Sequence, residues 1–156
     1  MKTELILVGK TTDKHFAAGI SDYASRICHY MPFSINVIAE LKNTKSLSED
    51  QQREREGEQI LKKVLSSDTL VLLDERGLEY DSVGFARWLE RQQLQGKRLL
   101  FVIGGPYGFS PAVYGRADGK LSLSKMTFSH QMIRLLFVEQ IYRAMTILSG
   151  EPYHHE

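Results

Sequence analysis

The stretch LLFVIGGPYGFSP, residues 99–111, joins an apolar run to a segment with three glycines and two prolines. Its first five residues are continuously apolar, which is typical of a strand that is buried on both faces of a sheet. The glycines and prolines that follow end such a strand abruptly. Because ligands of open α/β sheets bind beyond the carboxyl ends of the strands, the loop after residue 103 is a candidate binding site.

Strand-like and helix-like segments alternate along the rest of the chain. Apolar strands are predicted at residues 4–9, 33–41, 69–74, 98–105 and 119–124, and helices at residues 12–30, 48–65, 82–94 and 129–148. A turn is expected at residues 75–77. This alternation predicts an α/β fold with a parallel sheet that is covered on both faces, formed by residues 1–156 as a single domain.

Composition excludes several classes of protein. The 156 residues carry 20 Lys and Arg against 19 Asp and Glu, a net charge of +1, which gives no bulk signal for nucleic acid or an anionic membrane. No apolar run reaches the roughly 18 residues that span a bilayer, and no signal-peptide pattern is found. The single cysteine, Cys28, cannot form an internal disulfide and is expected to be a core thiol on an apolar helix face. We therefore expect a cytoplasmic protein with no membrane association.

Two phosphate-binding motifs are tested and disfavoured. VGKTTD, residues 8–13, resembles the end of a P-loop, but the glycine that such a loop needs is replaced by Glu4. The glycines of residues 104–108 form G-G-P-x-G rather than G-x-G-x-x-G, and Pro106 removes an amide donor. The loop of residues 104–108, together with the loops near residues 75 and 125, suits a ligand that is held by main-chain groups and apolar contacts.

The segment of residues 129–148 is apolar around most of the predicted helix, so we expect it to be buried on nearly all sides, within the domain or in a subunit interface. Glu139 and Arg143 are four residues apart, in the order that favours an ion pair. Arg143 is either part of a solvated edge or a residue that faces a site or a partner. His154 and His155 are adjacent, which is a poor spacing for metal ligands, and no metal site is predicted.

Four motifs are specific in combination: LDERG (residues 73–77), FVIGGPYG (101–108), LSLSKMTFSHQMIRLLFVEQIYRA (121–144) and GEPYHHE (150–156). With them the sequence resembles the RlmH family of SPOUT methyltransferases along its whole length. The resemblance implies an α/β-knot fold with a trefoil knot in the C-terminal part, a homodimer, and S-adenosylmethionine bound in the knot. It also implies methylation of N3 of a pseudouridine in 23S ribosomal RNA, on assembled ribosomes.

The resemblance also implies site residues. By position, the contacts to S-adenosylmethionine are expected from Leu73, Gly104, Leu123, Ser124, Lys125, Met126, Thr127 and Phe128. Arg143 and His154 are the candidate catalytic residues, Arg143 to hold the anionic base or a phosphate and His154 to close over the target, while Tyr153 is a candidate to stack on a base. Two alternatives stay open: a non-catalytic nucleotide- or flavin-binding module of flavodoxin-like design, and a protein whose last helix serves only dimerisation.

Overall fold

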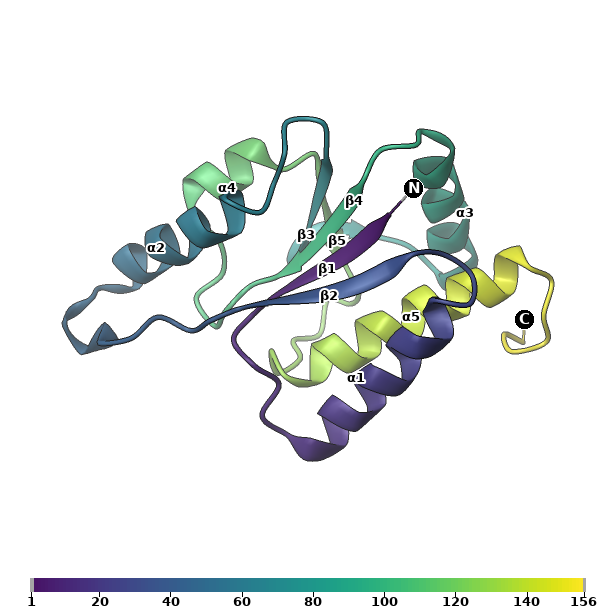
Figure 1. Ribbon diagram of the computed structural model, residues 1–156, viewed down its shortest axis with the longest axis horizontal. Coiled ribbons are helices and arrows are strands. Elements are labelled where there is room, and N and C mark those ends of the chain that lie inside the picture. The colour runs from purple at the N-terminus through teal and green to yellow at the C-terminus, as the bar shows by residue number, and fades with distance from the viewer. Residues whose placement is uncertain (1, 156) are drawn as a thin grey trace.

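The computed structural model describes residues 2–155, so the two ends of the predicted domain of residues 1–156 lie outside the described residues. One five-stranded sheet has helices on both faces (Figure 1). The strands are β1 (Thr3–Val8), β2 (Phe33–Ile38), β3 (Thr69–Glu79), β4 (Leu99–Ile103) and β5 (Gly119–Ser122). The helices are α1 (Lys14–Ile27), α2 (Glu49–Leu61), α3 (Ser82–Leu94), α4 (Pro111–Arg116) and α5 (Met132–Leu148), with a short 3-10 helix η1 (Thr44–Ser46).

The strand order is β2-β1-β4-β3-β5, and each pair of neighbours is parallel. The predicted parallel sheet is therefore confirmed. Since parallel strands end at the same edge, the loops that follow β1, β3, β4 and β5 come together there. The trefoil knot that the resemblance implies stays a prediction.

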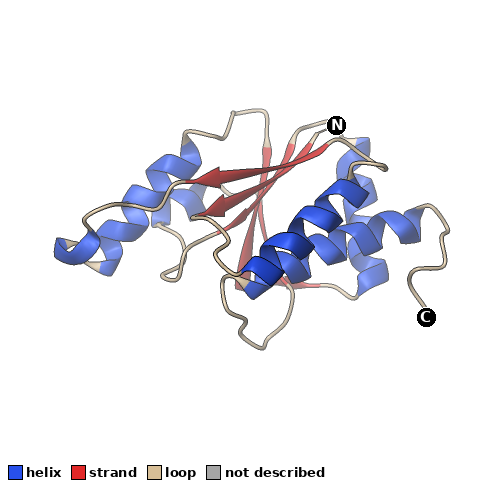
Figure 2. Cartoon of the chain, turned by 60° about the horizontal axis from the view of Figure 1, so that its bottom comes forward, coloured by secondary structure: helices blue, strands red, loops and turns tan. Residues whose placement is uncertain are grey.

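The two faces of the sheet carry separate hydrophobic clusters. Leu5 and Leu7 of β1 pack in the cluster that contains the buried side chains of α1, α3 and α5. Ile6 and Val8, which point the other way, pack in the cluster that contains those of α2 and α4. The cartoon in Figure 2 shows the sheet between these two groups of helices. Burial on both faces explains why the strands read as continuous apolar runs.

Helix α5 lies against both α1 and α3. Met132 is its one exposed residue, and the other positions are buried or half-buried. The prediction of a last helix that is buried on nearly all sides is thus confirmed only in part, since nine of its 17 residues are half-buried. In residues 2–155 no helix combines the length and the apolarity needed to cross a bilayer.

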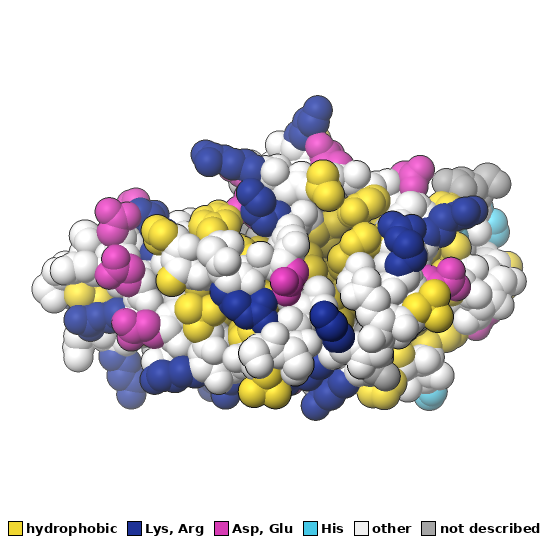
Figure 3. Space-filling view, turned by 90° about the horizontal axis from the view of Figure 1, so that it is seen from above, with side chains coloured by type: hydrophobic (Ala, Val, Ile, Leu, Met, Phe, Trp, Pro, Cys, Tyr) yellow, Lys and Arg dark blue, Asp and Glu magenta, His cyan; other side chains and the backbone are white. Residues whose placement is uncertain are grey.

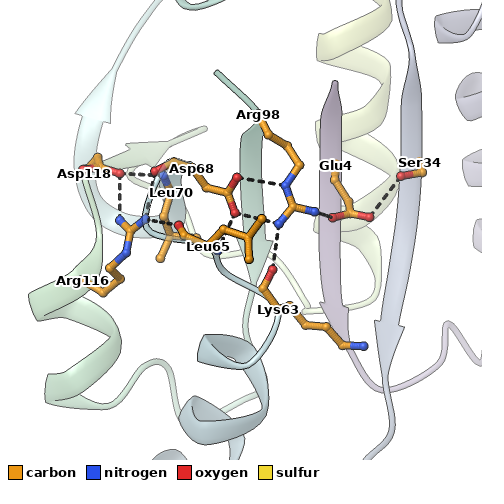
Figure 4. A network of polar contacts seen from close by, with 9 residues as sticks. All are labelled: Glu4, Ser34, Lys63, Leu65, Asp68, Leu70, Arg98, Arg116 and Asp118. Carbon is orange, nitrogen blue, oxygen red and sulfur yellow. Dashed lines mark hydrogen bonds and ion pairs between the residues drawn. The ribbon is translucent and has the colours of Figure 1, made fainter. Parts of the chain in front are cut away.

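A polar network joins the strands at their amino ends (Figure 4). Arg98 donates from Nε and Nη2 to the Asp68 carboxylate at 3.0 and 2.7 Å, and from Nη1 to Glu4 at 3.1 Å. Glu4 also accepts a bond from Ser34, at 3.2 Å. The bond from Arg98 is the main cause that lowers the pKa of Asp68. One arginine therefore connects the starts of β1, β3 and β4, at the edge opposite to the candidate site.

Strand β3 is longer than the sequence predicted. It was expected to end at residue 74, whereas it resumes its pairing with β5 and continues to Glu79. Leu73 and Leu78 both pair with Leu121, so residues 74–77 loop out of the ladder where the turn was expected. A Cβ atom on Gly77 would lie 2.6 Å from the Leu121 backbone nitrogen, so only glycine permits this approach.

The prediction that Cys28 is a core thiol is wrong. Helix α1 ends at Ile27, so Cys28 forms the cap of the helix rather than part of its buried face, and its side chain is exposed. Its Sγ lies 3.2 Å from the carbonyl oxygen of Phe33, to which it donates.

Candidate functional site

A cavity of about 720 Å³ opens at the carboxyl edge of the sheet. Its walls come from residues 73–76 within β3, from the loops that follow β4 and β5, and from the start of α5, with Arg53 of α2 and Tyr114 of α4 at its side. Seven of the eight residues predicted to bind the cofactor line it, namely Leu73, Gly104, Leu123, Ser124, Met126, Thr127 and Phe128. The eighth, Lys125, is exposed on the same loop as Leu123. The structure thus brings together three segments that are far apart in the sequence.

The glycines after β4 pack closely against their own chain. A Cβ atom on Gly104 would lie 2.9 Å from Cε1 of Phe109, and one on Gly105 would lie 2.9 Å from Oε1 of Glu56. The space that the absent side chains leave is therefore occupied by this protein's own groups. Burial, followed by repulsion from Glu40, raises the pKa of Glu56 despite a bond from the Gly105 amide.

Polar side chains surround the mouth of the cavity, and sequence reasoning missed them. Arg53 of α2 donates to the Tyr107 carbonyl oxygen at 3.1 Å. The Tyr114 hydroxyl donates to Asp74, and burial together with this bond raises the pKa of Tyr114 to about 12. Asp74 and Glu75 place two carboxylates at the cavity. Tyr114 escaped notice because α4 was not predicted.

A recognisable signal does mark the start of α4. Ser110 accepts a bond from the Val113 amide, and Pro111 stands at the first helical position. Serine followed by proline is a common helix start. With this helix assigned, Tyr114 would have been placed beside the loop of residues 104–108.

The loop of residues 123–130 is held by short-range bonds. Ser122 donates to the Ser124 carbonyl oxygen at 2.9 Å, and the Ser124 hydroxyl accepts from the Met126 amide at 2.9 Å. The Met132 amide donates to the Ser129 hydroxyl at 3.0 Å, which begins α5. Serines in this loop therefore shape its backbone rather than point only at a ligand.

The predicted catalytic residues lie in a second polar group. Arg143 donates to Glu139 at 2.7 Å, so the predicted ion pair is confirmed, and its Nη1 lies 3.0 Å from Nδ1 of His154. Because a guanidinium has only donors, Nδ1 of His154 is the acceptor. The Tyr153 hydroxyl donates to Glu139 at 2.9 Å, and the Tyr153 ring lies 4.8 Å from the Arg143 guanidinium. Burial, with bonds to Tyr23 and Glu139, raises the pKa of Tyr153.

This second group does not line the first cavity. His154 borders another cavity, of about 460 Å³, whose wall includes Leu121, Leu123 and Phe128. Those three residues also line the first cavity. Within one chain, Leu121, Leu123 and Phe128 therefore lie between His154 and the space beside Gly104. In the described part of the chain, no three His, Cys, Asp or Glu side chains are placed to hold a metal ion.

A family model described as "Predicted SPOUT methyltransferase" matches residues 1–154. The chain therefore belongs to the SPOUT methyltransferase family. A solved structure of a probable methylase family protein from Haemophilus influenzae shares the fold, with a TM-score of 0.54 at 12% identity over 99% of this chain and 70% of that one.

More similar relatives identify the group within the family. Ribosomal RNA large subunit methyltransferase H of Phocaeicola vulgatus is 60% identical over 157 residues, which cover 100% of both chains. The protein of the same name from Flavobacterium johnsoniae is 53% identical over 157 residues, again with 100% of both chains covered. The resemblance to the RlmH family is thus confirmed, which decides against the flavodoxin-like and purely dimerising alternatives.

Proposed function

We propose that the protein transfers a methyl group from S-adenosylmethionine to N3 of a pseudouridine in 23S ribosomal RNA, on assembled ribosomes. One observation carries the proposal. Residues from β3 and from the loops after β4 and β5, selected by family resemblance, meet around one cavity at the edge of the sheet where α/β proteins bind ligands.

The cavity suits S-adenosylmethionine, which combines an uncharged adenosine with a sulfonium cation. Its volume of about 720 Å³ lies in the usual range for cofactor sites. Leu73, Leu123 and Phe128 offer apolar contacts, and the backbone of the loop at Gly104 offers hydrogen bonds. Asp74 and Glu75 supply negative charge for the cation, beside the positive charges of Arg53 and Arg76.

Bound S-adenosylmethionine supplies a methyl group that the sulfonium has already activated. N3 of the base would form a bond to this methyl as the methyl–sulfur bond breaks and leaves a neutral thioether, and the N3 proton would pass to a base, so the protein must align the nucleobase, exclude water and stabilise the negative charge on N3. Arg143 is the cation that we assign to this charge or to a neighbouring phosphate. Arg143 also fixes the ring of His154 at 3.0 Å, and Tyr153 offers an aromatic face for a base.

A homodimer, which the resemblance implies, would bring the two groups of residues together. In one chain the loop containing Leu123 and Phe128 stands between His154 and the first cavity. In the dimer that we propose, Arg143 and His154 of one copy face the cofactor cavity of a second copy. We therefore propose that the site is completed across a dimer, in which α5 and the trefoil knot form part of the interface.

We place the protein in the cytoplasm, where ribosomes are. Its distribution of charge fits an enzyme that recognises the shape of a ribosomal site. The face drawn in Figure 3 has Lys and Arg interspersed with Asp and Glu, with hydrophobic side chains gathered in a hollow between them. A net charge of +1 over 156 residues gives little sequence-independent attraction for RNA. We expect efficient methylation of whole ribosomes and little of a naked stem-loop.

The test is transfer of tritiated methyl from S-adenosylmethionine to ribosomes from a strain that lacks this protein, followed by mapping of the modified base. Arg143→Ala and His154→Ala should lower the rate about 100-fold or more, with unchanged cofactor binding by calorimetry. Arg91→Ala, an exposed arginine of α3, serves as the matched control and should keep the wild-type rate. Full activity in both test variants would show that Arg143 and His154 do not have the roles assigned to them.

A further inference from the structure

Arg134, in the first turn of α5, is completely buried. Its guanidinium meets no carboxylate at ion-pair distance within residues 2–155, and burial lowers its pKa although the charge of Glu40 acts in the opposite direction. A positive charge near a helix N-terminus also opposes the helix dipole. Packing alone does not account for a charged side chain in such a place, where an apolar residue would suffice.

The bonds of Arg134 connect two distant parts of the chain. Its Nη2 donates to the Val8 carbonyl oxygen at 2.8 Å, and its Nη1 donates to that of Gly9 at 2.9 Å and to the Thr11 hydroxyl at 3.1 Å. Its Nε donates to the His130 carbonyl oxygen at 3.0 Å. The end of β1 is thereby fixed to the residue at which the loop of residues 123–130 ends.

Gln131 makes a second connection between the same segments. Its Oε1 accepts from the Thr12 amide at 2.7 Å, and its Nε2 donates to the Lys10 carbonyl oxygen at 3.2 Å. Arg134 and Gln131 together form what we call the α5 latch. It fastens residues 130–134 to residues 8–12 by side chains that can be changed one at a time.

The α5 latch adjoins the candidate cofactor cavity. Ser129, His130 and Ile133 all line that cavity, whereas Arg134 itself is not among its lining residues. The loop before them carries three consecutive exposed residues, 125–127, and is otherwise held by bonds of its own serines and by a bond of 3.5 Å from Thr127 to Glu75 of β3. Without the latch, its C-terminal end would lose its side-chain hydrogen bonds to the end of β1.

We infer that Arg134 and Gln131 are positioning residues, which hold the loop of residues 123–130 in the conformation that receives S-adenosylmethionine. The inference rests on the proposed function for the identity of the ligand. It assigns the order of the loop to contacts with the β1 end, made by side chains that do not line the candidate cavity. Pre-ordering of this kind lowers the entropy lost on binding.

The test compares Arg134→Lys and Gln131→Ala with the wild type. Arg134→Lys keeps the charge but loses the planar set of donors, and Gln131→Ala removes only a half-buried amide. Amide hydrogen exchange of the free protein should become about tenfold faster or more in residues 123–130, with α3 unaffected. In the methyl-transfer assay, the KM for S-adenosylmethionine should rise about tenfold, while the KM for ribosomes and kcat at saturating cofactor change little.

Ile141→Val is the matched control, since Ile141 is fully buried in α5 but bonds to no loop. It should lower the melting temperature without a change in exchange at residues 123–130 or in the cofactor KM. Wild-type exchange of that loop in both latch variants would overturn the inference, as would an equal rise in KM for Ile141→Val. If the wild type does not bind S-adenosylmethionine, the proposed function fails, and the exchange measurement still decides whether the latch orders the loop.

Discussion

Replacement of Asp68 by asparagine should destabilise the fold and leave the site intact. In the wild type, Asp68 receives two bonds from Arg98, at 3.0 and 2.7 Å, and one from the Leu65 amide at 2.7 Å. The side chain of Asp68 is 2% exposed and that of Arg98 is 27% exposed. An asparagine keeps the shape but removes the charge that balances the guanidinium.

The size of the effect follows from this burial. Removal of one partner from a buried ion pair costs about 3–5 kcal/mol. Arg98 is partly solvated and retains Glu4 at 3.1 Å and the Lys63 carbonyl oxygen at 2.9 Å, so we expect a lower figure, about 2–3 kcal/mol. For a chain of 156 residues this corresponds to a melting temperature lower by about 4–12 °C.

The pH dependence gives a second measurement. The pKa of Asp68 is lowered from 3.8 in the folded protein, mainly by the bond from Arg98. A lowered carboxyl pKa contributes stability that is present above the unfolded value and is lost as pH falls through the folded value. The difference between wild type and Asp68→Asn should therefore be full at pH 7 and shrink below about pH 4.

Thermal melts at pH 7 and pH 3 test both expectations. The control is Asp22→Asn, which breaks the exposed pair with Arg26 on α1 and should change stability by less than about 1 kcal/mol. The KM for S-adenosylmethionine should stay at its wild-type value, since Asp68 lies at the amino edge of the sheet. An Asp68→Asn protein that melts with the wild type at pH 7, or a difference that persists unchanged at pH 3, would refute the reasoning.

Two further predictions concern the packing around α2. The pKa of Glu56 is raised, so the charged form of Glu56, which prevails at high pH, destabilises the fold. The melting temperature of Glu56→Gln should therefore be higher than that of the wild type at pH 8 and equal to it near pH 4. The same difference in melting temperature at both pH values would contradict this. A methyl group on Gly57 would meet Ser110 and lie 3.1 Å from Val113, so Gly57→Ala should push α2 from α4 and lower stability by about 1–3 kcal/mol in denaturant melts. Gly115→Ala, which meets open space in α4, is its control, and an equal loss there would argue against a packing effect.

Local sequence patterns predicted the elements better than their arrangement. Continuous apolar runs such as residues 99–103 identified the buried strands, because burial on both faces leaves no polar alternation. The placement of β4 beside β1 depends on contacts such as that between Thr3 and Leu99, which no local pattern contains. The helix that was missed, α4, is six residues long and too short to show a period.

At the site, too, contacts between residues close in the sequence could be predicted, and contacts between distant residues could not. The ion pair of Glu139 and Arg143 could be predicted because four residues on a helix fix the distance. The bonds of Arg134 to Val8 and Gly9 could not, because they join residues more than 120 positions apart. Family resemblance predicted that Leu73, Gly104 and Phe128 lie at one site, and all three line the same cavity. The physical reason is the parallel sheet, because parallel strands end at a common edge.

The position of α5 has a consequence for synthesis of the protein. This helix packs against both α1 and α3, yet it is made more than 35 residues after α3 ends at Leu94. Until residues 132–148 have emerged from the ribosome, the nascent chain lacks the element that covers the apolar sides of α1 and α3. We expect the finished core to form only after α5 has emerged, so that the nascent chain depends on protection from aggregation until then.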